Sequence, residues 1–225
     1  MIVIKKNKEP QELTQYRKQP DASYENMHGA KLNPEQSEQD VYHIVLDSLL
    51  REQGYLCAYC MCRIPKKRGN PPCTIEHIIA QSDPNGDPLS YKNMVAVCSG
   101  NRNANDNADK TCDARRGNKK LHVNPLDEST IKEIEYQSTG IIYSQNLEIN
   151  TDLNDRLNLN CISLSLPETR KKVLDALKND MAKKGLKNNS SFRERCQKQL
   201  QYYETQEKKK PYVGILIWWL KKHIK

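Results

Sequence analysis

The chain has 225 residues, of which 36% are hydrophobic and only one is Phe, so its core is small for its length. A core of this kind often depends on a further stabilising element, such as a bound metal ion. The formal net charge of +8 suits a polyanionic partner, although charge alone leaves a merely basic protein equally open. Residues 165–225 hold 16 Lys and Arg against 6 Asp and Glu, so the basic surplus lies near the C-terminus.

Apolar runs are short throughout the sequence. The N-terminus has too few consecutive apolar residues for a signal peptide, and the run over residues 213–220 is far below the roughly 20 residues of a membrane span. We therefore expect a cytoplasmic protein with no membrane partner. Cysteines stay reduced in the cytoplasm, so clustered cysteines predict metal ligands rather than disulfides.

Three regions are expected along the chain. A polar N-terminal arm covers residues 1–32, a cysteine-rich core with a preceding helix covers residues 33–128, and a hairpin with a basic helical region covers residues 129–225. Within the arm, residues 2–4 predict a short strand. The rest of the arm is weakly patterned and is expected to order only against something else.

Hydrophobic periodicity and turn residues predict an α+β chain. The first helix is expected over residues 33–53, because Asn33 can cap it and Gly54 can end it. An Asn-rich insertion loop is expected over residues 99–111. The other expected elements are a knuckle over 55–64, strands over 73–80 and 93–98, a short helix from Cys112, a hairpin over 131–136 and 141–143, and helices over 167–184, 190–206 and 212–224.

Two groups of cysteines bracket the core. A C-x-x-C turn supplies half of a tetrahedral zinc site, but the second half is irregular because 13 residues separate its two cysteines. The preferred ligand set is Cys57, Cys60, Cys98 and Cys112. Cys62 and Cys73 remain rivals for the second half of the site. A site made of four thiolates has no open position, so this zinc is expected to be structural.

Four polar residues lie between or beside the cysteines, namely Glu76, His77, Asn93 and Asp113. Hydrolysis of a phosphodiester requires a base that activates water and a cation that neutralises charge at the phosphate. His77 titrates near neutrality and suits the base, whereas the carboxylates of Glu76 and Asp113 suit Mg²⁺ or Mn²⁺. Asn93 is expected to brace the loop and orient His77. The ordered set indicates a hydrolytic site more strongly than any one residue does.

In this order the residues resemble the HNH endonucleases, whose ββα-metal core has a form supported by a zinc knuckle. The matching motifs are Cys57-x-x-Cys60, Glu76-His77-Ile78, Asn93 and Cys112-Asp113-x-x-Arg116-Gly117. The resemblance implies an α+β, treble-clef-like core in which Glu76 and Asp113 bind the catalytic metal. It also implies that His77 is the general base and that Asn93 positions it. The sequence departs from the family pattern at three positions. It has Glu76 where the pattern has Asp, Asp113 where the pattern has Asn or His, and Arg116 where the pattern has Lys. The two acidic replacements keep oxygen ligands.

A closer likeness extends over more of the chain. The Cys-Ala-Tyr-Cys-Met knuckle, the Ile-Glu-His-Ile strand, the Asn-rich insertion and the Asn-Pro-Leu-Asp segment before the hairpin are similar to the PtuB-type HNH nucleases. These belong to Septu and retron-linked anti-phage systems. The resemblance implies a PtuA-like ATPase partner and, in some systems, a retron reverse transcriptase with its RNA–DNA hybrid.

Three functions remain open on the sequence. The leading hypothesis is a metal-dependent endonuclease, with DNA favoured over RNA or tRNA as the substrate and with Arg115 and Arg116 holding phosphate. The basic C-terminal region is compatible with a zinc-stapled nucleic-acid-binding module without cleavage activity. The third hypothesis is an ATPase-docking module with a degenerate nuclease fold. The residue set from Glu76 to Asp113 favours the first, because binding alone does not require it.

Overall fold

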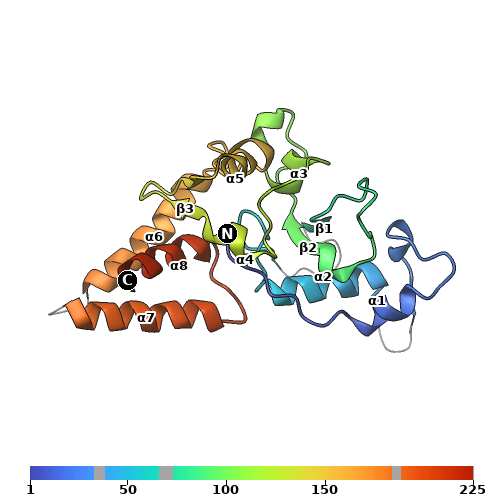
Figure 1. Cartoon of the computed structure of the whole chain (residues 1–225), viewed down its shortest axis with the longest axis horizontal. Helices are drawn as coiled ribbons and strands as arrows, with labels where there is room; N and C mark the ends of the chain where they lie inside the picture. Colours follow the sequence, from blue (N-terminus) through green and yellow to red (C-terminus); the bar gives the residue numbers. More distant parts are fainter. Residues whose placement is uncertain (33–38, 66–72, 184–188, 225) are drawn as a thin grey trace.

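The computed structural model describes residues 1–32, 39–65, 73–183 and 189–224. They form a mixed α+β architecture with two separate two-stranded antiparallel sheets, which confirms the predicted class. Figure 1 shows the first sheet and its neighbouring helices on the right and the three long C-terminal helices on the left. The chain therefore combines a small ββα core with a C-terminal helical extension.

The N-terminal residues pack against the rest of the chain. They contain helix α1 (Gln11–Tyr16) and a short 3-10 helix, η1 (Glu25–Met27), and they bury side chains such as Leu13. The prediction of a strand over residues 2–4 is wrong, because this segment forms no ladder. Ile4 instead donates its backbone N–H to the carbonyl of Pro125 (2.8 Å). The segment thus orders against its own chain.

Helix α2 (Val41–Glu52) precedes the cysteine knuckle and begins later than predicted. Its cap is Asp40, whose carboxylate accepts a hydrogen bond from the backbone N–H of His43 (2.9 Å). The predicted cap, Asn33, lies outside the described residues. Gly54 follows the helix with a left-handed φ of 62°, as expected for a residue that ends a helix.

The ββα order of the core is the predicted one. Strand β1 (Cys73–His77) pairs antiparallel with β2 (Met94–Cys98), and Glu76 lies opposite Val95. Helix α3 (Cys112–Arg116) follows β2 after a loop that contains a 3-10 helix, η3 (Asn107–Asp109). Strand β1 ends three residues before its predicted end, so Glu76 and His77 are its last two residues.

The second sheet is the predicted hairpin, with shorter arms. Residues 131 and 132, which were expected to start its first arm, belong instead to the short helix α4. The tight turn between the two strands contains Gly140, which has a φ of 87°. The elements of this region are α4 (Glu128–Lys132), β3 (Ile134–Tyr136), β4 (Ile142–Ser144), α5 (Leu147–Thr151) and a short π-helix, η4 (Asp152–Arg156).

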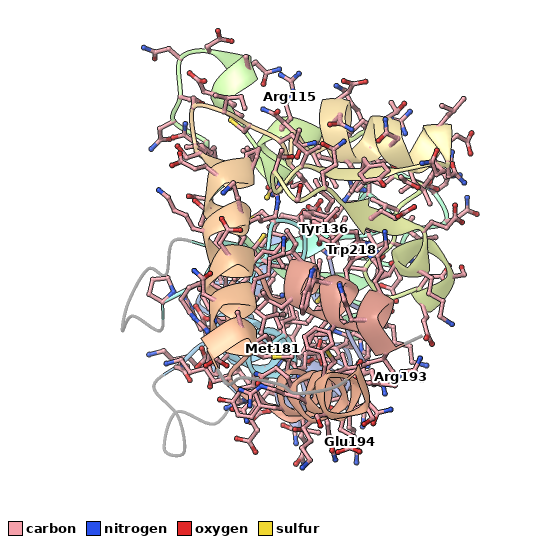
Figure 2. The ribbon with its side chains drawn as sticks, turned by 90° about the vertical axis from the view of Figure 1, so that its left-hand side faces the viewer. Arg115, Tyr136, Met181, Arg193, Glu194 and Trp218 are labelled. Atoms are coloured by element: carbon pink, nitrogen blue, oxygen red, sulfur yellow. The ribbon has the colours of Figure 1, made fainter. Side chains whose placement is uncertain are left out.

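Three long helices complete the chain close to their predicted bounds. They are α6 (Leu166–Lys183), α7 (Asn189–Thr205) and α8 (Val213–Ile224). Figure 2 shows Tyr136 of β3 beside Trp218 of α8, and their ring centroids lie 5.8 Å apart. This contact joins the hairpin to the helical extension. None of the helices within the described residues is both long and apolar enough to span a membrane.

Candidate zinc cluster and active site

Four cysteine thiols converge within the ββα core. The sulfur atoms of Cys57, Cys60, Cys98 and Cys112 all lie within 4.8 Å of one another. The Cys60–Cys98 distance is 3.7 Å, and the Cys57–Cys112 and Cys98–Cys112 distances are each 3.8 Å. A tetrahedron of sulfurs at the Zn–S distance of about 2.3 Å has edges of about 3.8 Å. The cluster therefore fits Zn²⁺.

Local backbone geometry aims these thiols at one another. The backbone N–H of Cys57 donates to the carbonyl of Cys62 (3.0 Å), which closes the knuckle around Met61 in a left-handed conformation. Cys112 is also left-handed, with a φ of 54°, and its N–H donates to the carbonyl of Leu157 (2.9 Å). Such conformations are costly for residues with a Cβ, so both need the surrounding structure to hold them.

The two rival cysteines lie outside the set of four. Cys62 is half-buried beside the cluster, and Cys73 begins β1. Three of the four clustered cysteines are buried and Cys98 is half-buried, so the cluster has no open face for a substrate. Its geometry is that of a structural site.

Glu76 is buried at the end of β1, where it is 9% exposed. Its carboxylate pairs with the guanidinium of Arg116 and accepts a hydrogen bond from the Tyr59 hydroxyl (3.3 Å). Burial raises the pKa of Glu76 to about 7, the charge of Arg116 opposes this rise, and the carboxylate of Asp113 adds to it. The carboxylate of Asp113 therefore lies near enough to disfavour the charged form of Glu76.

Arg116 lies beneath this site rather than on its surface. Its side chain is 2% exposed and donates hydrogen bonds to the carbonyls of His77 and Ile78 (2.7 Å each), in addition to Glu76. A guanidinium with its donors used inside the protein cannot also reach an incoming phosphate. The predicted phosphate contact of Arg116 is therefore wrong, and the residue instead ties α3 to the end of β1.

Asp113 lies in the first turn of α3 and is partly exposed. It pairs with Arg102, which extends from the Asn-rich loop and has a side chain 53% exposed. Arg115 donates hydrogen bonds to the carbonyls of Asp155 (3.1 Å) and Asn107 (2.8 Å). Figure 2 shows Arg115 in the upper part of the molecule, above α7 and α8. Its predicted role in holding phosphate stays a prediction.

His77 is buried at the end of β1, with both ring nitrogens in hydrogen bonds. Its Nε2 lies 2.9 Å from the carbonyl of Pro88, and its Nδ1 lies 3.0 Å from the amide nitrogen of Gln81. A carbonyl only accepts, so this pattern assigns the proton of the neutral ring to Nε2 and leaves the lone pair on Nδ1. Tyr24 packs edge-on against the ring. Burial lowers the pKa of His77, which favours the neutral form.

Asn93 braces the loop that leaves β1. Its Oδ1 accepts from the backbone N–H of Ile79 (2.8 Å), and its Nδ2 donates to the carbonyl of the same residue (2.9 Å). The backbone N–H of Ile78 also donates to the carbonyl of Asn93 (2.9 Å). These bonds fix the backbone of the two residues after His77, and the role of Asn93 in positioning the histidine stays a prediction.

Three residues at this site carry no strong signal in the sequence. Tyr59 lies inside the C-x-x-C turn, where only the cysteines attract notice, yet its hydroxyl reaches Glu76. Gln81 and Arg102 lie in irregular loops, which have no periodicity to indicate where a side chain points. The position of a residue along a loop does not predict which distant residue its side chain will contact.

Comparison with known proteins agrees with this geometry. Residues 57–100 match the HNH endonuclease family. This segment, which holds three of the clustered cysteines and the residues Glu76, His77 and Asn93, is an HNH endonuclease domain. HNH endonucleases are phosphodiester hydrolases that act on nucleic acid. The matched segment ends before α3, so Cys112 and Asp113 lie outside the family match, and only the structure relates them to the matched residues. No curated protein matches the chain.

Proposed function

We propose that the chain is a metal-dependent HNH endonuclease in which His77 is the general base and Glu76 and Asp113 hold a catalytic Mg²⁺ or Mn²⁺. One observation supports this proposal. The cysteine cluster joins the knuckle, β2 and α3, and the carboxylate of Asp113 on α3 contributes to the raised pKa of Glu76, the neighbour of His77. Zinc would thus be structural, and the hydrolytic chemistry would lie at the adjacent end of β1.

The donor set fits a hard divalent cation. Two carboxylates leave most positions of an octahedral ion for water and phosphate, as Mg²⁺ sites usually do. The contacts from Arg116 and Tyr59 both use Oε1 of Glu76, so neither of them occupies Oε2. Arg102 bonds Oδ2 of Asp113 from an exposed position and can leave at little cost. When bound, the cation would neutralise charge on the phosphate and the leaving oxygen.

His77 is arranged to take a proton from water at Nδ1. The carbonyl of Pro88 holds Nε2–H and so fixes the tautomer and the ring orientation. Burial lowers the pKa of His77, so the neutral form that accepts a proton predominates near pH 7. The amide of Gln81 now donates to Nδ1 and would give way to the water.

The direct test is a cleavage assay with Mg²⁺ or Mn²⁺ on duplex DNA, single-stranded DNA, RNA and tRNA, with DNA expected to be cut best. Glu76→Gln removes a charged ligand but keeps the shape of the side chain, so it should raise the metal concentration needed for cleavage. Failure of the wild-type chain to cut any of these substrates with either metal would overturn the proposal.

A second candidate has its own supporting observation. Both carboxylates of the site pair with arginines, and both nitrogens of His77 accept or donate hydrogen bonds, so every group has a protein partner. A zinc-stapled nucleic-acid-binding or ATPase-docking module without cleavage activity would keep such pairs permanently. Binding of nucleic acid or of the ATPase with no metal-dependent cleavage by the assembled complex would favour this function.

We also propose that the nuclease is a cytoplasmic effector of an anti-phage complex with a PtuA-like ATPase and, in some systems, a retron reverse transcriptase with its RNA–DNA hybrid. The support is the motif likeness over the knuckle, β1 and the Asn-Pro-Leu-Asp segment. All eight cysteines lie in the described part of the chain and none of them is in a disulfide, in keeping with a reducing compartment. Co-expression with a PtuA-type ATPase should yield a complex that elutes as one species, and separate elution would contradict it.

A further inference from the structure

The linker between α7 and α8 forms a cationic pocket beside the cysteine knuckle. The pocket has a volume of about 280 Å³, and its lining includes Arg63, Tyr202, Tyr203, Lys208, Lys209 and Lys210. Among the described residues that line it, none is acidic. Glu76, His77 and Asp113 do not line it either, so it is separate from the active site. The mechanism proposed above does not use it.

The walls of this pocket are held in place by backbone hydrogen bonds. The N–H of Lys209 donates to the carbonyl of Gly54 (3.2 Å), and the N–H of Tyr212 donates to the carbonyl of Met61 (2.9 Å). Arg63 donates to the carbonyls of both Gly54 (2.8 Å) and Lys209. A Cβ on Gly54 would lie 2.2 Å from the Lys209 side chain, so the linker approaches as closely as glycine allows. The pocket is therefore preformed.

The lining charges are not all equally available. Lys209 directs its ammonium to the carbonyls of Tyr203 and Glu204 at the end of α7. The guanidinium of Arg63 already donates to backbone carbonyls. Lys208 and Lys210 are exposed, and Lys210 lies over the ring of Tyr203 (5.9 Å to the centroid). The carboxylate of Glu204 pairs with Lys221 outside the pocket. Two ammonium groups thus remain to meet an anion from solvent.

The aromatic residues give the pocket a second kind of surface. The side chain of Tyr202 is 53% exposed, which is unusual for a large ring, whereas Tyr203 is buried against it with ring centroids 5.6 Å apart. Cationic groups beside an exposed aromatic ring are the combination with which proteins bind unpaired nucleotides, because the cations meet phosphate and the ring stacks on a base.

We propose that this pocket binds one unpaired nucleotide of the nucleic-acid strand on which the nuclease acts, with Lys208 and Lys210 at its phosphates and Tyr202 stacked on its base. This proposal rests on the proposed function and adds to it a substrate contact outside the active site. The volume of about 280 Å³ lies just below the usual range for ligand sites, about 300–1,000 Å³, which suits no more than one nucleotide. A duplex keeps its bases stacked on one another and would offer Tyr202 no open face.

The test measures binding without cleavage. Fluorescence anisotropy follows a labelled single-stranded oligonucleotide and the matching duplex without Mg²⁺ or Mn²⁺, over a range of salt concentrations. The variant Lys208→Ala/Lys210→Ala should bind the single strand about tenfold more weakly, and its salt slope should fall by about 1.4, or about 0.7 for each lost phosphate contact. Tyr202→Ala should weaken single-strand binding about tenfold, whereas Tyr202→Phe should retain it.

A matched control removes the same charge elsewhere. Lys171 and Lys172 are exposed on α6 and pair with carboxylates of their own helix, so Lys171→Ala/Lys172→Ala should change binding less than twofold. Wild-type binding by the pocket variants, or an equal loss in the control, would overturn the proposal. So would tight AMP binding that depends on Tyr202 while the oligonucleotide is unaffected, because the pocket would then serve a free nucleotide. Binding through the pocket without cleavage would overturn only the nuclease function.

Discussion

The cysteine cluster and the candidate active site belong to the same ββα unit but are built in opposite ways. In the cluster, four sulfur atoms approach one another and surround a common centre. In the active site, each candidate group is bonded to a different protein partner, in the pairs Glu76–Arg116, Asp113–Arg102 and His77–Gln81. The four thiols face one another, so the ligand that suits them is a metal ion. The catalytic groups, in contrast, can exchange their present protein partners for metal, water and substrate.

The partners in the active site also differ in how firmly they are held. Arg116 is buried and bonded to several acceptors, whereas Arg102 is mostly exposed and comes from a loop. A buried pair that loses one partner leaves an uncompensated charge, but an exposed pair costs little to break. Substitutions should therefore have effects that fall from the cluster, through the buried groups, to the exposed loop.

The largest effect is expected at the cluster. Cys57→Ser removes one of four thiolates, and because structural zinc contributes directly to folding, the variant should lose its metal and its cooperative unfolding transition. Metal analysis and circular dichroism would measure both. The wild-type chain should contain about one zinc ion.

A matched substitution at the rival cysteine makes this test specific. Cys62 is half-buried beside the cluster but is not one of the four, so Cys62→Ser should keep both the zinc and the fold. If Cys62→Ser loses zinc while Cys57→Ser retains it, the ligand set has been assigned wrongly.

The second effect concerns the chemistry alone. His77→Ala removes the proposed base, and cleavage should slow by about 10²- to 10⁴-fold, the usual contribution of general-base catalysis. Single-turnover cleavage would give the rate, and anisotropy would show whether binding is unchanged. Gln81→Ala is the control, because it removes the amide that bonds Nδ1 but leaves the imidazole, and it should keep the activity. Equal rates for wild type and His77→Ala would remove His77 from the mechanism.

The third effect is on stability. Arg116→Met leaves the buried carboxylate of Glu76 without its cation, and breaking a buried pair in this way costs about 3–5 kcal/mol. Since the pKa of Glu76 is already raised to about 7, uptake of a proton should keep the loss near the lower limit. Urea denaturation would measure it. Arg115→Met removes a half-buried arginine of the same helix that donates only to backbone carbonyls in its hydrogen bonds, so it should change the free energy of unfolding far less. Similar losses in the two variants would contradict a buried structural role for Arg116.

Local patterns in the sequence predicted much of the fold, and contacts between distant segments account for the differences. The C-terminal helices α6, α7 and α8 have the expected bounds because apolar periodicity extends along their whole length. The start of α2 differs because Asp40 is as good a cap as Asn33. Such alternatives are decided by packing that a single sequence does not show.

In the active site, too, local patterns were predictable from the sequence and contacts between distant segments were not. The cysteine spacing predicted the four residues whose sulfur atoms cluster, because ligand chemistry allows few residue types, whereas the catalytic role of the Glu-His pair stays a prediction. The role of Arg116 was not predictable, because an arginine beside carboxylates reads equally as a phosphate contact or as a buried pair. Only its burial at 2% exposure distinguishes the two.

The smallest expected effect tests whether the active-site pairs can be exchanged. If Arg102 competes with the catalytic cation for Asp113, then Arg102→Ala should raise the affinity for Mn²⁺ by about two- to fivefold, the range that an exposed ion pair is worth. Titration with Mn²⁺ at low ionic strength, followed by electron paramagnetic resonance, would measure this affinity. Arg195→Ala removes an equal charge that pairs with Asp180 on the helical extension and should leave it unchanged. A lower affinity for Mn²⁺ in Arg102→Ala would mean that the arginine helps to hold Asp113 in position for the metal. An equal rise in affinity in both variants would mean that the change in net charge alone causes the effect.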